Sequence, residues 1–171
     1  MTRFLLSLHV LAAIIAVGPV AVAASMFPRS LRRARESPDA AAALATLGVL
    51  HRVCRVYAGV GIAVPLFGFA TASSLGVLGS AWLITAIALT GVAAGVLAFV
   101  ILPAQQAALS AVSALAGPAE EARATEPAGA IEPTGAVKAA ARLAAATGVF
   151  NLLWATVTVL MIVRPGSTTG A

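Results

Sequence analysis

From Val56 to Ala119 the chain reads VYAGVGIAVPLFGFATASSLGVLGSAWLITAIALTGVAAGVLAFVILPAQQAALSAVSALAGPA, without a single charged residue. The surface of a water-soluble fold must alternate with its core, so such a fold cannot readily leave so long a stretch uncharged. A fold that faces lipid can. Of the 171 residues, 60% are hydrophobic and only 10% are charged, against about 25% charged in ordinary soluble domains. The sequence therefore predicts an all-α polytopic membrane protein.

Four segments are long enough to span a bilayer, which takes about 20 mostly apolar residues. They cover about 4–27, 49–72, 81–102 and 139–163. A single helix from Val56 to Leu102 would be roughly 70 Å long, about twice the hydrocarbon thickness. The chain must therefore turn back, and Ser73–Ser80, rich in Gly and Ser, is the expected turn. We expect one membrane domain, 1–171, with four transmembrane helices in an up-down bundle.

The segments between the spans carry helix and linker signals. Ser37, Pro38 and Asp39 indicate an N-cap, a first helical residue and an acid in the first turn, so the second helix is expected to begin before the lipid. A flexible linker is predicted at about 117–137, where proline and glutamate accumulate. Pro19 and Pro65 should bend the first and second spans, because proline removes a backbone donor.

The basic residues are distributed unequally between the two ends of this bundle. Up-down threading places both termini and the second loop on one side, with Arg3 and Arg164. The other side holds Arg29, Arg32, Arg33, Arg35, Arg52, Arg55, Arg123, Lys138 and Arg142. The positive-inside rule then places the first and third loops in the cytoplasm and both termini outside. The net charge of +5 does not indicate nucleic-acid binding, because the basic residues flank apolar spans without an aromatic platform.

An alternative for the first span is a cleaved signal peptide. It has a basic start, an apolar run and an A-x-A pattern at Ala21–Ala23. The apolar run is long for a signal peptide, which usually has about 7–15 apolar residues. Cleavage would also leave the first loop outside and invert the charge asymmetry, so we expect the span to be retained.

Polar side chains within the spans are candidates for function, because they are expensive in hydrocarbon. His9 and Asn151 form the candidate intramembrane polar site. His9 could ligate a haem, alone or as a pair across a dimer. The alternative is a structural hydrogen bond from His9 to Asn151, to a threonine hydroxyl or to a backbone carbonyl. His9 and His51 should lie roughly 20 Å apart along the membrane normal, too far to share one iron.

A basic cluster is expected at the cytoplasmic end of the first two spans. It comprises Arg29, Arg32, Arg33, Arg35, His51, Arg52 and Arg55. One interpretation is a site for an anion or a lipid phosphate. The other is snorkelling of long side chains to anionic headgroups on the cytoplasmic side.

Gly91 and Gly95 form a GxxxG motif in the third span. Small residues let helix backbones approach, and such packing is a main source of helix association in lipid. The motif could serve packing inside the monomer or the seam of a homo-oligomer.

Once the spans are placed, the chain resembles a bacterial family of four-helix integral membrane proteins of unknown function, catalogued as domain of unknown function 2269. The resemblance is carried by FLLSLHVLAA at 4–13 with Gly18-Pro19, by Phe27-Pro28-Arg29, by the HRxxRxY pattern of 51–57, and by LMIVRP at 160–165. It implies a fold and a bacterial inner-membrane location, but no activity. More distantly, the start at His9 is similar to copper-resistance and haem-related four-helix membrane families. Their Trp-x-Gly-Gly element reads Ala16-Val17-Gly18-Pro19 here.

Three classes of function follow from these features. The first is a non-enzymatic structural or accessory membrane component, since the chain lacks a Ser/His/Asp arrangement, an HExxH motif and a P-loop. The second is a haem- or metal-binding membrane protein that uses His9. The third is a small-molecule or lipid permease with a cavity near Pro19 and Pro65 and polar contacts from Asn151 and His9. No cofactor is expected in the first class.

Overall fold

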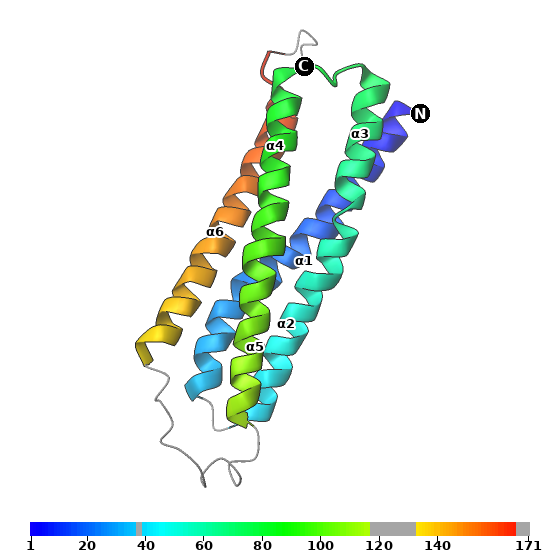
Figure 1. Ribbon diagram of the computed structural model, residues 1–171. Coiled ribbons are helices and arrows are strands. Elements are labelled where there is room, and N and C mark those ends of the chain that lie inside the picture. The colour runs from blue at the N-terminus through cyan, green and yellow to red at the C-terminus, as the bar shows by residue number, and fades with distance from the viewer. Residues whose placement is uncertain (37–38, 117–132, 167–171) are drawn as a thin grey trace, which may run out of the picture.

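The computed structural model describes residues 1–36, 39–116 and 133–166, and this part of the chain is all-α (Figure 1). Its elements are α1 (Thr2–Glu36), α2 (Ala40–Val60), α3 (Ala63–Leu75), α4 (Ala81–Gly95), the π-helix η1 (Val96–Ile101), α5 (Leu102–Ala116) and α6 (Pro133–Val163). They form four rods: α1, then α2 with α3, then α4 with η1 and α5, then α6. Within the described residues, each rod is long and apolar enough to cross a membrane.

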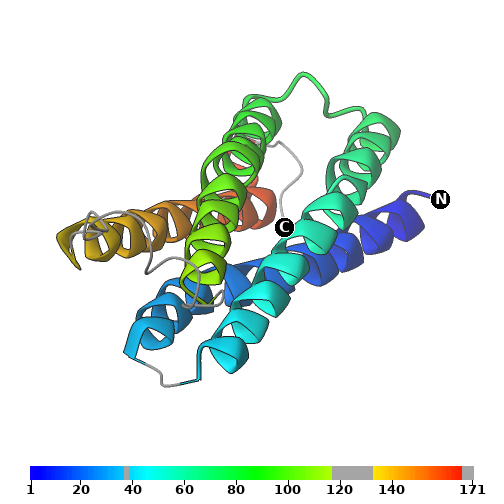
Figure 2. The same ribbon diagram turned by 60° about the horizontal axis from the view of Figure 1, so that its bottom comes forward.

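The rods form an antiparallel bundle (Figures 1 and 2). α1 packs against α2, α3 and α6, α6 packs against α4 and η1, and α2 packs against α5. The N-terminus, the end of α6 and the turn between α3 and α4 lie at one end of the bundle, and the end of α1 and the start of α2 lie at the other (Figure 1). The up-down order predicted from the sequence is confirmed.

The predicted turn at 73–80 is also confirmed. α3 ends at Leu75, and Gly76 adopts the left-handed conformation, with φ of 68°. Glycine has no Cβ, so it takes this conformation readily and stops the helix. The Val77 N–H donates to the Ala72 carbonyl at 3.1 Å, which completes the cap. α4 begins at Ala81, and its first turn packs Trp82 against Ala72.

The second helix begins ahead of its predicted span, at Ala40, as its start signals indicated. Helix boundaries differ from the prediction at two places. Asp39 was expected in the first turn of the second helix, and this was wrong: it is the N-cap, and its carboxylate accepts the Ala42 N–H at 2.9 Å. Ser37 and Pro38 lie outside the described residues. The predicted linker at 117–137 is too long, since α6 begins at Pro133; 117–132 lie outside the described residues.

Two rods are locally interrupted. The second rod breaks at Gly61–Ile62, where the Val64 N–H donates to the Gly61 carbonyl at 3.1 Å. Pro65 follows and cannot donate to that carbonyl itself, so the break agrees with the predicted effect of this proline. The third rod widens into η1 just before Pro103. Pro19 lies inside α1, which continues through it.

The core of the bundle combines small side chains with a few large ones. Alanines fill many buried positions, which lets the helices approach closely. These buried alanines are Ala16, Ala23, Ala24, Ala72, Ala86, Ala93 and Ala140. The largest side chains that are almost fully buried are Phe27, Leu47, Cys54, Ile101 and Gln105. Gln105 is the polar exception among these buried side chains, and it belongs to the candidate site described below.

Candidate functional site

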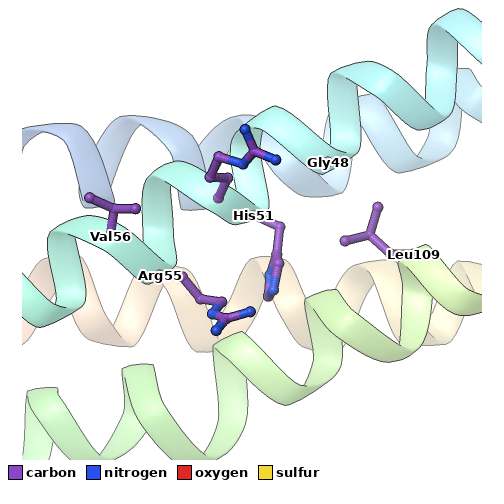
Figure 3. Close-up of a pocket in the computed structure, with 6 residues that line it drawn as sticks. Gly48, His51, Arg55, Val56 and Leu109 are labelled. Carbon is purple, nitrogen blue, oxygen red and sulfur yellow. The ribbon is translucent and has the colours of Figure 1, made fainter.

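Three residues of the predicted basic cluster line one open cavity between α2 and α5. His51, Arg52 and Arg55 share it with Gly48, Val56 and Leu109, and its volume is about 560 Å³ (Figure 3). The α2 residues are spaced three or four apart, so they lie on one helix face. Gly48 leaves open space, since a Cβ there would meet nothing within 4 Å.

A buried polar contact joins the wall of this cavity to the opposite helix. His51 is only 7% exposed, and its Nδ1 lies 3.1 Å from Oε1 of Gln105. Nε2 of Gln105 donates in turn to Sγ of Cys54 at 3.6 Å. Gln105 and Cys54 are fully buried. In Figure 3 the His51 ring points from α2 toward α5, beside the guanidinium of Arg55.

The second ring nitrogen of His51 has no such contact. Nε2 is buried and finds no hydrogen-bond partner in the described part of the chain. Leaving a buried polar group unpaired costs about 1–3 kcal/mol, so native structures nearly always satisfy such groups. His51 lines the cavity together with two arginines, so its unpaired ring nitrogen indicates a place for a ligand.

The π-helix explains why Gln105 faces inward. Ala93, Leu97, Ile101 and Gln105 are all buried, at steps of four residues. An α-helix turns about 100° per residue, so twelve residues would leave Gln105 about 120° away from the direction of Ala93. The extra residue of a π-turn removes about 100° of this mismatch. η1 lies between Ala93 and Gln105, and it keeps Gln105 directed toward α2.

The other basic residues of the cluster do not line the cavity. Arg29, Arg32 and Arg33 are exposed on α1, and the side chain of Arg35 lies outside the described residues. The predicted cluster therefore divides into a cavity group on α2 and a separate exposed group on α1. Gln105, which the sequence analysis did not select, joins the first group. The four-residue spacing of Leu97, Ile101 and Gln105 was the only available signal.

His9 makes a structural hydrogen bond. Its Nδ1 donates to the backbone carbonyl of Val64 at 2.9 Å, which is one of the three structural partners expected. Its ring also lies against Gly68, where a Cβ would come within 3.0 Å of Cε1 and 3.2 Å of Nδ1. Gly68 therefore makes room for the histidine ring, a role that the sequence analysis did not predict.

His9 and Asn151 do not form one polar site, so that prediction was wrong. Nδ2 of Asn151 donates to Oγ of Ser25 at 3.2 Å. Ser25 lies about 24 Å further along α1 than His9, by helical rise. The two polar groups are thus held by different parts of the bundle.

The histidines also lie apart. His9 contacts Val64, which is about 20 Å along the second rod from His51, in agreement with the separation expected from the sequence. Within the described residues, no group of three or more His, Cys, Asp and Glu side chains could hold a metal ion. Haem ligation by His9 alone stays a prediction, with Nε2 as the available nitrogen.

A second cavity lies in the middle of the bundle. It has a volume of about 190 Å³, and residues of all four rods line it, among them Val20, Pro65, Leu97 and Trp154. The cavity was expected near Pro19 and Pro65; Pro65 lines it, whereas Pro19 does not, although its neighbour Val20 does. Neither His9 nor Asn151 lines it, so the polar contacts expected for a permease are not there.

Gly91 and Gly95 do not pack closely against another helix in the described structure. A Cβ added at either glycine would meet nothing within 4 Å. Close packing inside the monomer is therefore not their role, and a seam between copies stays a prediction.

Comparison with known proteins adds no relative. No protein-family model, curated protein or solved structure matches the chain. The family resemblance noted from the sequence thus stays a prediction, and function has to be argued from the site.

Proposed function

We propose that this chain is a four-span integral protein of a bacterial inner membrane, with a non-enzymatic structural or accessory role, and that its basic end holds anionic lipid headgroups. One observation carries the membrane assignment: large apolar side chains point outward from every rod. Exposed examples are Phe4, Ile14, Val22, Val49, Ile62, Leu66, Ile84, Phe99, Leu152 and Ile162. Contiguous apolar surface on this scale is rare in soluble monomers.

Burial along the rods supports the same proposal. In the most apolar window of each rod, between 11% and 33% of the residues are buried inside the bundle. A soluble four-helix bundle of this length would hide its apolar residues and expose its polar ones. Here the outward faces are apolar, so lipid is the solvent that fits them.

The rods are longer than a bilayer is thick, and this supports a position of the candidate site at one membrane surface. A rod of 35 residues is about 52 Å long, whereas the hydrocarbon core is about 30 Å. If the turn at Gly76 marks one interface, Arg55 lies about 30 Å away along α3 and α2. The cavity with His51, Arg52 and Arg55 would then lie at the level of the opposite headgroups.

Charge supports an orientation for the bundle. Arg3 and Arg164 belong to the end with the turn, and Arg164 lies over the Trp82 ring at 5.7 Å. The remaining described basic residues gather toward the other end. We therefore propose that this second end faces the cytoplasm and that both termini lie outside. Anionic headgroups would attract it by on the order of 1 kcal/mol per basic residue.

The polar side chains favour a structural or accessory role over catalysis. Thr71, Thr90 and Thr147 donate to carbonyls of their own helices one turn earlier. Such bonds satisfy the hydroxyls in an apolar setting without forming a convergent site.

Two measurements test the proposal. Membranes from expressing cells should keep the protein through an alkaline carbonate wash and release it only in detergent; recovery in the aqueous wash would contradict the membrane assignment. Native mass spectrometry of the detergent-purified protein should show adducts with anionic phospholipids in preference to phosphatidylcholine. The double substitution R52A/R55A should reduce these adducts at least tenfold. R32A/R33A removes the same charge outside the cavity and is the matched control; it should reduce the adducts less than R52A/R55A does.

A further inference from the structure

The hydrogen bonds around Gln105 define what His51 can offer a ligand. The amide Nε2 of Gln105 donates to Cys54 Sγ at 3.6 Å, so its Oε1 faces His51. A carbonyl oxygen only accepts, and Nδ1 of His51 therefore carries the proton of this bond. In a neutral imidazole the other nitrogen then has a free lone pair. Nε2 of His51 is thus a buried acceptor without a donor among the described residues.

The cavity combines this acceptor with two cations. Arg52 and Arg55 line it together with His51, and guanidinium groups bind phosphate through charge-assisted hydrogen bonds. A ligand that satisfies all three groups needs an anionic phosphate and, a few bonds away, a hydroxyl that donates to Nε2. A headgroup with an ammonium donor would bring a positive charge next to both arginines, which is unfavourable.

We propose that the cavity between α2 and α5 recognises polyol phosphate esters, in which a phosphodiester binds Arg52 and Arg55 and a glycerol- or sugar-type hydroxyl donates to His51 Nε2. This rests on the proposed function of the basic end and names the headgroup class. The volume of about 560 Å³ is within the range of small-molecule pockets. Gly48 contributes the open space at one wall.

The decisive comparison uses two lipids that differ only in the hydroxyls. Phosphatidylglycerol and phosphatidylpropanol carry the same single charge, the same three-carbon headgroup and, in dioleoyl form, the same tails. Native mass spectrometry titrations of the wild-type protein should show roughly two- to tenfold tighter binding of phosphatidylglycerol, the factor that one net hydrogen bond supplies. H51F should bring the ratio of the two affinities to about one while both lipids still bind. G48L should fill the cavity and weaken both lipids with every charge retained.

The outcomes separate this inference from the proposed function. Equal binding of the two lipids, both above phosphatidylcholine, would overturn hydroxyl recognition and leave anionic-lipid binding intact. Binding equal to phosphatidylcholine would overturn both. If H51F does not fold, the wild-type comparison alone decides.

Soluble esters identify the source of the ligand. Displacement of phosphatidylglycerol by glycerol 3-phosphate but not by ethyl phosphate supports the inference and indicates a water-soluble ester. Lipid selectivity without displacement supports it and indicates the lipid. Equal displacement by both esters would overturn the role of the hydroxyl.

Discussion

At the scale of single residues, the His9 ring lies against Gly68 and requires a glycine at this position. Replacing glycine by alanine inside a helix gains up to about 1 kcal/mol in helix propensity. Here the new Cβ would lie 3.0 Å from the His9 ring, and moving the ring would weaken its 2.9 Å bond to the Val64 carbonyl. We expect G68A to destabilise the wild-type protein by about 1 kcal/mol and to stabilise the H9A variant.

The opposite effects of G68A with and without His9 can be measured from the free energy of unfolding in detergent of G68A, H9A and the double variant. G148A is the matched control, since a Cβ at Gly148 meets nothing within 4 Å and its effect should not depend on His9. An effect of G68A that is the same with and without His9 would contradict the contact.

Gln105 is a second residue whose effect depends on its partner. Q105L keeps the size of the side chain but leaves both ring nitrogens of His51 buried without a partner. We expect a loss of about 1–3 kcal/mol in the free energy of unfolding. The double substitution H51F/Q105L removes both polar partners and should recover most of this loss, because an apolar pair needs no hydrogen bond. Additive losses in the double variant would count against the pairing.

At the scale of elements, the π-helix sets the rotation of α5 relative to α4. Deleting Phe99, which is 82% exposed, should convert η1 to an α-helix and turn α5 by about 100°. Gln105 would then leave Cys54, which is fully buried and is the single cysteine of the chain. We expect Cys54 to become reactive toward maleimide in detergent, while F99A leaves it protected. Protection in the deletion variant would show that η1 does not position Gln105.

The same elements show what the sequence could and could not predict. Hydropathy and length predicted the four rods, and Gly76 lies in the turn expected between the second and third. The pairing of His51 with Gln105 depends on a π-turn, which hydropathy does not register because one added residue leaves the segment just as apolar. His9 and Asn151 were paired because both are rare in an apolar setting. A polar residue is rare in an apolar span because it is costly to bury there, and this does not imply that two such residues lie close together. His9 and Asn151 each have a nearer partner on another helix.

At the scale of the whole molecule, the bundle separates a weakly charged end from a basic one. The turn between α3 and α4 and the end of α6 lie together at the first end (Figure 1). The cavity and the exposed arginines of α1 belong to the second. A retained α1 is needed for this arrangement, since Val20 and Ala24 are buried in the main core on either side of the A-x-A pattern. N-terminal sequencing of the membrane-extracted protein should therefore find no cleavage after Ala23.

The orientation can be measured because the chain has one cysteine. In a C54A background, single cysteines at Gly79 and Pro165 should react with a membrane-impermeant maleimide on intact cells whose outer membrane has been made permeable. Cysteines at Ala41 and Val137, both exposed at the other end, should react only after the inner membrane is opened. Positive charge is retained preferentially on the cytoplasmic side, which is the reason for the expected order. The reverse pattern would place the cavity outside the cell, and labelling of all four sites on intact cells would remove the bundle from the membrane.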